Sequence, residues 1–160
     1  METPYVTASE TPNSIFRFPM ASFSQQIRVT YGDTDQMGIV YHANYLNYFE
    51  VSRTEMMRSQ GLTYRSMEAA GVLLQVVHCE IDFHRPAHYD DLLEVRSVVS
   101  RMGKASLVIS SEVWRGKELL VTGKVKLASV SRQQGRIIPL PQQLIDAVQQ
   151  FYSVPDGTAG

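Results

Sequence analysis

The segment Tyr31–Tyr45 holds the densest group of side chains that could do chemistry. It reads YGDTDQMGIVYHANY and supplies the carboxylates of Asp33 and Asp35, the hydroxyl of Tyr41 and the imidazole of His42. The segment leads into a predicted helix, whose first backbone amides are unpaired donors with a partial positive charge. Such a place can bind an oxyanion, while a nearby carboxylate attacks a carbonyl carbon or deprotonates the water that does so. The structural alternative is a cap or a turn, which Asp commonly forms before a helix.

The helix that must position this segment is predicted to begin at Asn44, which can cap it. Tyr45, Phe49 and Met56 recur at the spacing of one helical face, and Gly61 is the predicted stop. A helix of about 16 residues spans roughly 24 Å, at 1.5 Å per residue. It is therefore long enough to lie across one face of a sheet.

Apolar and polar residues alternate in five further stretches, which predicts half-buried strands. Turns at Gly103 and Gly116 separate the last three stretches in the manner of antiparallel hairpins. Pro141 opens a predicted short helix at the end, and no strand–helix–strand alternation suggests a parallel sheet. The predicted fold is therefore α+β, with a five-stranded antiparallel sheet and one long helix. The alternating residues are Ile27, Val29 and Tyr31; Val77, Cys79, Ile81 and Phe83; Leu93, Val95, Ser97 and Val99; Leu107, Ile109, Ser111 and Val113; and Leu119, Val121, Val125 and Leu127.

The composition is that of one globular domain. The formal net charge of the 160 residues is −1, which argues against a protein whose whole surface grips nucleic acid or acidic lipid. We predict a flexible leader over residues 1–22, a single domain over 23–152 and a tail over 153–160. Cys79 is the only cysteine, which excludes an internal disulfide and a cysteine-rich metal site. Because we recognise neither a secretory signal nor an apolar run of about 20 residues, we expect a cytoplasmic protein without membrane insertion.

The loop and helix together resemble the 4-hydroxybenzoyl-CoA thioesterase family of hotdog-fold proteins, and within it the YbgC-like acyl-CoA thioesterases. The resemblance extends roughly over residues 25–132, and its loop motif is much more specific than a lone glycine-rich turn. It implies a hotdog fold, in which an antiparallel sheet wraps around a long helix, in agreement with the predicted elements. The matching residues are Tyr31, Asp33, Thr34, Asp35, Gly38, Val40, Tyr41, His42, Asn44, Tyr45, Phe49, Glu50, Arg53, Phe83, Arg85, Pro86 and Asp90.

The resemblance implies an enzyme that hydrolyses the thioester of an aliphatic or aromatic acyl-CoA to a free acid and CoA. It places the catalytic carboxylate on Asp35, with His42 beside the thioester, Tyr31 near Asp35, and a backbone amide between Tyr41 and Ala43 polarising the carbonyl. For His42, a capping or structural role remains the alternative. No metal or redox cofactor is implied, because coenzyme A is part of the substrate. Hotdog subunits further imply a homodimer or homotetramer with active sites at the subunit interface.

Coenzyme A carries phosphates, so the resemblance also implies cations near the site. Arg101 and Lys104 flank the predicted turn at Gly103, and Arg132 ends the last predicted strand. In the family, basic residues in comparable places meet the nucleotide. The alternative is that these three are ordinary solvated charges.

One departure from the family concerns the acyl group. Benzoyl-specific relatives carry Pro after the aspartate, whereas Gln36 and Met37 follow Asp35 here, and His42 replaces a tyrosine. We therefore expect an acyl group other than 4-hydroxybenzoyl.

Two further hypotheses concern Glu50 and the remaining histidines. Glu50 is the rival carboxylate, because some hotdog thioesterases use a helical Glu, although here it can pair with Arg53 one turn later. His78 and His84, together with His88, invite a metal site, but strand positions 78 and 84 stand about 20 Å apart, too far to share one ion.

The scaffold also leaves alternative functions open. A hotdog hydratase or dehydratase would transfer protons on the acyl chain, with its Asp and His closer in sequence than Asp35 and His42. The thiol carrier could be acyl carrier protein in place of CoA. A third alternative is a non-catalytic acyl-carrier or protein-partner module.

Overall fold

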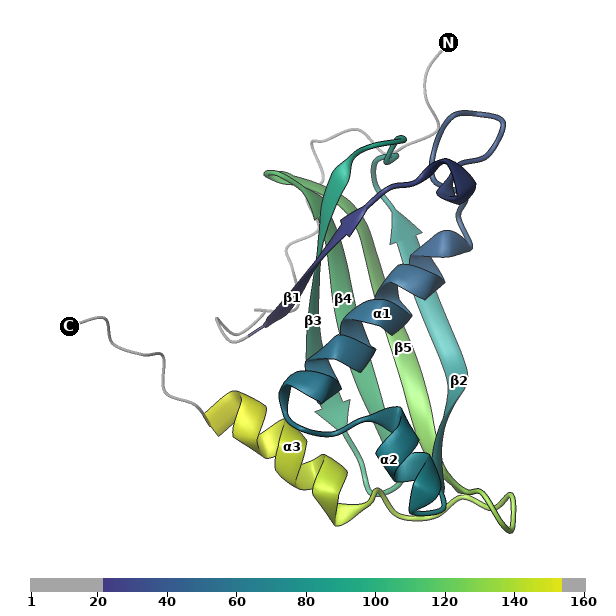
Figure 1. Cartoon of the computed structure of the whole chain (residues 1–160), viewed down its shortest axis with the longest axis vertical. Helices are drawn as coiled ribbons and strands as arrows, with labels where there is room; N and C mark the ends of the chain where they lie inside the picture. The colour runs from purple at the N-terminus through teal and green to yellow at the C-terminus, as the bar shows by residue number, and fades with distance from the viewer. Residues whose placement is uncertain (1–21, 154–160) are drawn as a thin grey trace, which may run out of the picture.

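The computed structural model describes residues 22–153, so most of the predicted leader and tail lie outside the described residues. A five-stranded antiparallel sheet has the strand order β1-β3-β4-β5-β2, and helix α1 lies across one of its faces (Figure 1). This is the predicted α+β arrangement, and the hotdog fold is confirmed. The elements are β1 (Phe23–Arg28), η1 (Tyr31–Asp33), α1 (Asn44–Ser59), α2 (Tyr64–Ala69), β2 (Val72–Phe83), β3 (Leu92–Met102), β4 (Ser106–Arg115), β5 (Glu118–Ser131) and α3 (Gln142–Ser153).

Helix α1 has the predicted length of 16 residues and ends as predicted, with Gly61 in the left-handed region at φ 76°. Its buried face carries Tyr45, Phe49 and Met56. The predicted cap was off by one residue. Ala43 holds the N-cap position and makes no side-chain cap, whereas Asn44 is the first helical residue and uses its side chain elsewhere.

The helix packs very closely on the middle of the sheet. A methyl group on Gly123 of β5 would lie 2.4 Å from the Phe49 ring, so only glycine fits beneath this side chain. Nearby, the hydroxyl of Ser97 on β3 lies 2.8 Å from those of Ser52 on α1 and Ser111 on β4, and all three serines are buried. This chain of hydrogen bonds satisfies the polar groups that the strand pattern turns toward the core.

Two parts of the fold differ from the predicted elements. Strand β1 ends at Arg28, and Tyr31, predicted to belong to the strand, begins the short 3₁₀ turn η1. Helix α2 was not predicted. Its six residues are held by a capping box in which Thr63 and Ser66 each bond the other's backbone N–H. A helix this short shows no apolar period.

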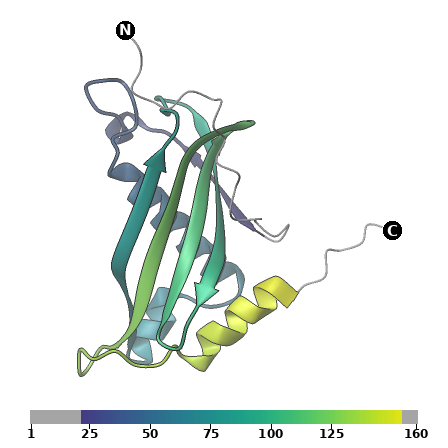
Figure 2. The ribbon, with the colours of Figure 1, turned by 180° about the vertical axis from the view of Figure 1, so that it is seen from behind.

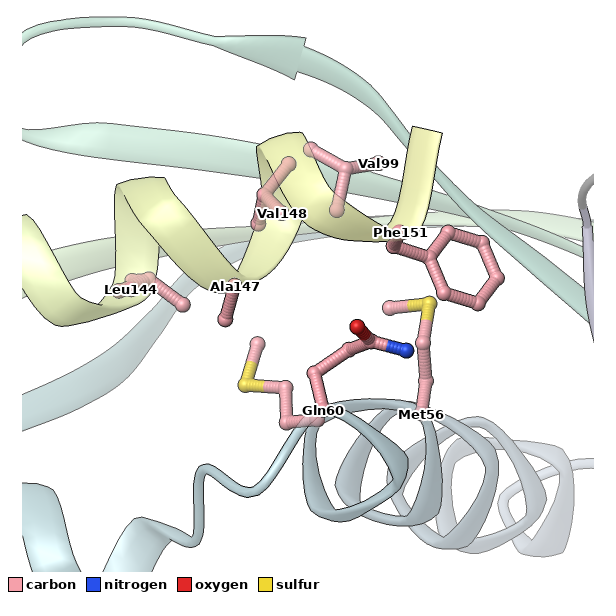
Figure 3. A pocket seen from close by; sticks show the side chains of 8 residues that line it. Met56, Gln60, Val99, Leu144, Ala147, Val148 and Phe151 are labelled. Carbon is pink, nitrogen blue, oxygen red and sulfur yellow. The ribbon is translucent and has the colours of Figure 1, made fainter. Parts of the chain in front are cut away.

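Figure 2 shows the opposite face of the sheet, with α1 lying behind it. Helix α3 covers one end of α1, where Leu144, Ala147 and Phe151 approach Met56 (Figure 3). The apolar cavity between them measures only about 20 Å³, roughly the room one water needs, so this end of the core is nearly filled.

Among residues 22–153, no helix is long and apolar enough to span a membrane.

Candidate active site

The aspartate loop, residues 30–43, is folded back onto the start of α1. The backbone carbonyl of Asp33 accepts hydrogen bonds from the Tyr41 amide and from the Asn44 side-chain amide, each at 2.8 Å. The backbone amide of Asn44 in turn donates to the backbone carbonyl of Tyr41 at 2.9 Å. These bonds fix the position of the loop relative to the first turn of the helix. The sequence predicts only a capping role for Asn44, and no local signal points to this contact with the loop.

The two carboxylates of the loop have different surroundings. Asp33 accepts from both the backbone N–H (2.8 Å) and the hydroxyl (2.9 Å) of Thr30. Tyr48 lies beneath it, and its pKa is raised by burial and, to a lesser degree, by the neighbouring Asp33 charge. Asp33 is therefore occupied in holding the loop, which is the structural role considered for either acid.

Asp35 is half-buried, and its carboxylate accepts fewer hydrogen bonds than that of Asp33. Its Oδ1 accepts from the Met37 amide at 2.8 Å, while Oδ2 receives no hydrogen bond from the described part of the chain. The turn beneath it is closed by a 2.9 Å bond from the Gly38 amide to the Asp35 carbonyl, and Gly38 has a φ of 75° that favours glycine. One oxygen of Asp35 is thus available to a water or to a carbonyl carbon.

His42 lies two residues before Asn44, the first residue of α1. Its ring is exposed and packs against the Tyr41 ring, with centroids 4.5 Å apart. Among residues 22–153, the backbone amides of His42 and Ala43 donate to no acceptor. The loop therefore brings an available carboxylate oxygen and two unpaired amides to the same short stretch of chain.

Tyr31 was predicted to support Asp35. In the structure its ring is exposed and stacks on Tyr89, with centroids 4.0 Å apart and planes 11° from parallel. Its part in the chemistry stays a prediction.

A second loop, residues 84–91, backs the aspartate loop. The Val40 amide donates to the Ala87 carbonyl at 2.8 Å, and Ile39 forms an isolated antiparallel β-bridge with His88. Asp91 anchors this second loop, because its Oδ2 accepts from the His88 amide (2.8 Å) and from Arg115 (2.7 Å). Burial acts to raise the pKa of Asp91, but these two hydrogen bonds and the nearby charges of Arg115 and His88 together outweigh it and lower the pKa. The sequence offered no signal for this pair, which joins residues far apart in the chain.

Glu50 lies on the exposed side of α1. Its side chain is 65% exposed, and its carboxylate stands 3.9 Å from the Arg53 guanidinium, the ion pair expected from their spacing. It lies six positions after Asn44, about 9 Å along the helix axis.

The three predicted CoA contacts lie away from Asp35. Arg101 and Lys104 are near the far end of β3, about 30 Å along the strand from its start at Leu92, which follows the second loop. Arg132 follows β5 at that same end, where its guanidinium donates to the Glu68 carbonyl at 3.4 Å. Among the described residues, no three His, Cys, Asp or Glu side chains are grouped so that they could hold a metal ion.

Comparison with known proteins agrees with the fold. The chain is 34% identical over 123 residues to the acyl-CoA thioesterase YbgC of Haemophilus influenzae, an alignment that covers 76% of this chain and 90% of that one. It is 29% identical to the acyl-CoA thioester hydrolase YbgC of Escherichia coli O6:H1, with 86% and 98% covered. The solved structure of a DHNA-CoA thioesterase from Staphylococcus aureus superposes with a TM-score of 0.75 at 27% identity and covers 82% of this chain and 89% of that chain.

The family model of the thioesterase-like superfamily matches residues 29–149, which include the aspartate loop, helix α1 and all strands but β1. The chain belongs to this superfamily of hotdog-fold proteins.

Proposed function

We propose that this protein is an acyl-CoA thioesterase that hydrolyses the thioester of an aliphatic or aromatic acyl-CoA to a free carboxylic acid and CoA. The observation that carries the proposal is that one loop, leading into α1, holds both the available oxygen of Asp35 and the unpaired amides of His42 and Ala43. The family membership and the activities named for the YbgC relatives support it.

In the proposed reaction the thioester carbonyl oxygen lies against the amides at the helix start. As the carbonyl becomes tetrahedral, its oxygen gains negative charge, and each such donor contributes about 3–4 kcal/mol. Asp35 either deprotonates the attacking water or attacks the carbonyl carbon itself, forming an anhydride that water then opens. The C–S bond breaks, the thiolate takes up a proton, and the new C–O bond leaves the carboxylic acid. His42 lies beside the thioester, and Tyr31 supports the rim of the site.

The distance between Asp35 and the distal cations favours an assembly of two subunits. The pantetheine arm is comparable to about five residues of extended chain, or roughly 17 Å. This is much shorter than the 30 Å or so by which β3 separates the second loop, packed on the aspartate loop, from Arg101 of the same subunit. Antiparallel pairing of β2 with β2 of a second copy would bring Lys104, Arg132 and Arg101 of the partner subunit toward the aspartate loop. We propose a homodimer, or a homotetramer of two such dimers, with these cations on the CoA phosphates.

Strand β2 is suited to that pairing. It is an edge strand, and its residues 75–80 are all exposed, including Val76 and Val77. An exposed apolar edge is a ready template for another strand. Light scattering should return twice or four times the 18.0 kDa mass of the chain.

No metal or redox cofactor takes part in the proposed hydrolysis, and CoA enters as part of the substrate. The free thiol of Cys79 is exposed, which suits a reducing compartment, and we propose a cytoplasmic location.

The test is thiol release from a panel of short, long and aromatic acyl-CoAs, followed with a thiol-reactive dye. We expect turnover on at least one ester and its loss in Asp35→Asn. A panel with no turnover would contradict the proposal for CoA esters, and acyl-carrier-protein esters and hydration of enoyl esters would then be assayed. Lys104→Ala should raise KM for CoA esters, and an unchanged KM would remove Lys104 from the nucleotide site.

A further inference from the structure

The outer face of the sheet, opposite α1, carries a groove of about 300 Å³. On β5 the residues that line it, Lys124 and Lys126, alternate with Val125 and Leu127, which belong to the core beneath α1. The groove therefore lies on the other side of the sheet from α1. Its volume is at the lower end of the range that small-molecule sites occupy.

Cations from two strands reach this groove at a spacing set by the strand register. Lys126 pairs with Val108 of β4, which pairs with Arg101 of β3, so the three share one row across the sheet. Because neighbouring strands are about 4.8 Å apart, the backbones of Lys126 and Arg101 stand about 10 Å from one another. Lys124 is two residues from Lys126 on the same face, about 7 Å away along β5.

The groove is positively charged. Arg101, Lys124 and Lys126 line it together with a single carboxylate, Glu80, so three cations minus one anion leave +2 when His78 is neutral. Glu80 is itself 3.1 Å from the His78 ring on β2. Within residues 22–153, neither Arg101 nor Lys126 forms an ion pair.

The floor of the groove is polar and carries the small side chain of Ser100. The Ser100 hydroxyl donates to the Val108 carbonyl (3.3 Å) and accepts from the Ser110 hydroxyl (2.7 Å). Ser100 sits where the register between β3 and β4 shifts by one residue, between Val99 and Arg101. Such a bulge bends the strand and re-aims the side chains beside it.

We propose that this groove binds a small ligand that carries two or more separated phosphate groups. The guanidinium of Arg101 suits a two-pronged contact with one phosphate, and the lysines, whose strand lies about 10 Å away across the sheet, suit a second phosphate in the groove between them. The ligand is either a free nucleotide-like molecule, in which case the groove is a second site, or the nucleotide end of the CoA substrate, in which case the inference rests on the proposed function.

The direct test uses adenosine 3′,5′-bisphosphate as the probe, titrated into the full chain by calorimetry, with inorganic phosphate as the single-phosphate comparison. We expect the bisphosphate to bind more tightly than phosphate, and Lys126→Ala to weaken it about tenfold, the lower end of what a hydrogen bond between charged groups contributes. Lys126→Arg should keep the affinity. Lys117→Ala, which removes an exposed lysine from the β4–β5 turn, is the matched control and should leave binding unchanged.

Absence of bisphosphate binding, or equal binding by wild type and Lys126→Ala, overturns the groove site, and neither result depends on turnover. If Lys126→Ala loses binding, the KM of this variant for its thioester substrates identifies which molecule supplies the phosphates. A KM that rises for an acyl-CoA but not for the matching acyl-pantetheine assigns the groove to the substrate. A KM unchanged for both assigns it to a separate phosphorylated ligand.

Discussion

The side-chain amide of Asn44 donates a 2.8 Å hydrogen bond to the backbone carbonyl of Asp33. This contact joins the first residue of α1 to the aspartate loop, two residues before Asp35. In the proposed mechanism the carboxylate and the helix-start amides act on the same carbonyl group, so their relative position decides the rate. Asn44 is therefore a positioning residue.

Asn44→Ala should lower kcat while KM changes little. Displacement of catalytic groups by about 1 Å costs up to roughly a hundredfold in rate, so we expect a loss of about tenfold to a hundredfold. Steady-state thiol release measures both constants. Asn47→Ala, an exposed position one turn along α1, is the control and should behave like the wild type. Equal kcat values for the two variants would show that the bond does not position the site.

Gly123→Ala should destabilise the protein, because its methyl group would meet the Phe49 ring at 2.4 Å. Overpacking of a core typically costs about 1–3 kcal/mol, which urea unfolding can resolve. Gly103→Ala is the control, since a Cβ there makes only an ordinary contact, 3.5 Å from the Ser106 carbonyl. In the Gly123→Ala background, Phe49→Leu should recover part of the loss. Additive effects of the two substitutions would contradict this packing account.

Asp91 should make the fold sensitive to acid. Burial opposes its ionisation, but the bonds from His88 and Arg115 hold the pKa of the folded carboxyl below its ordinary value. The unfolded chain therefore takes up a proton first, and the stabilisation, complete above the unfolded pKa, is lost as pH falls through the folded one. Asp91→Asn should be less stable than wild type near about pH 7, and the difference should shrink toward about pH 2. A difference that stays constant with pH would contradict the role of this carboxylate.

Much of the fold could be predicted because its signals are local. The period of two in the strands and the face formed by Tyr45, Phe49 and Met56 each follow from neighbouring residues. Helix α2 could not be found in this way, because six residues complete less than two turns. Tyr31 continues the alternation begun at Ile27, yet the chain turns at Thr30, where Asp33 bonds the backbone.

The site could be predicted only in part. The loop motif points to Asp35, whose catalytic role stays a prediction, and the structure shows that its Oδ1 accepts from the Met37 amide. Alternation alone did not distinguish which cations share a groove, because that depends on the β3–β4–β5 register and on a bulge at Ser100. The Asp91–Arg115 contact joins residues 24 positions apart, and only the tertiary structure brings them together.

The most direct test of the central claim compares Asp35→Asn with Glu50→Gln on the acyl-CoA that the wild type hydrolyses fastest. Both substitutions remove one negative charge and keep the size of the side chain, and circular dichroism checks that both variants fold. We predict that Asp35→Asn lowers kcat by about 10²–10⁴, the contribution typical of a positioned acid or base, and that Glu50→Gln stays within a few fold of wild type. Near-normal turnover by Asp35→Asn, together with loss in Glu50→Gln, would contradict the account and place the chemistry on the helix.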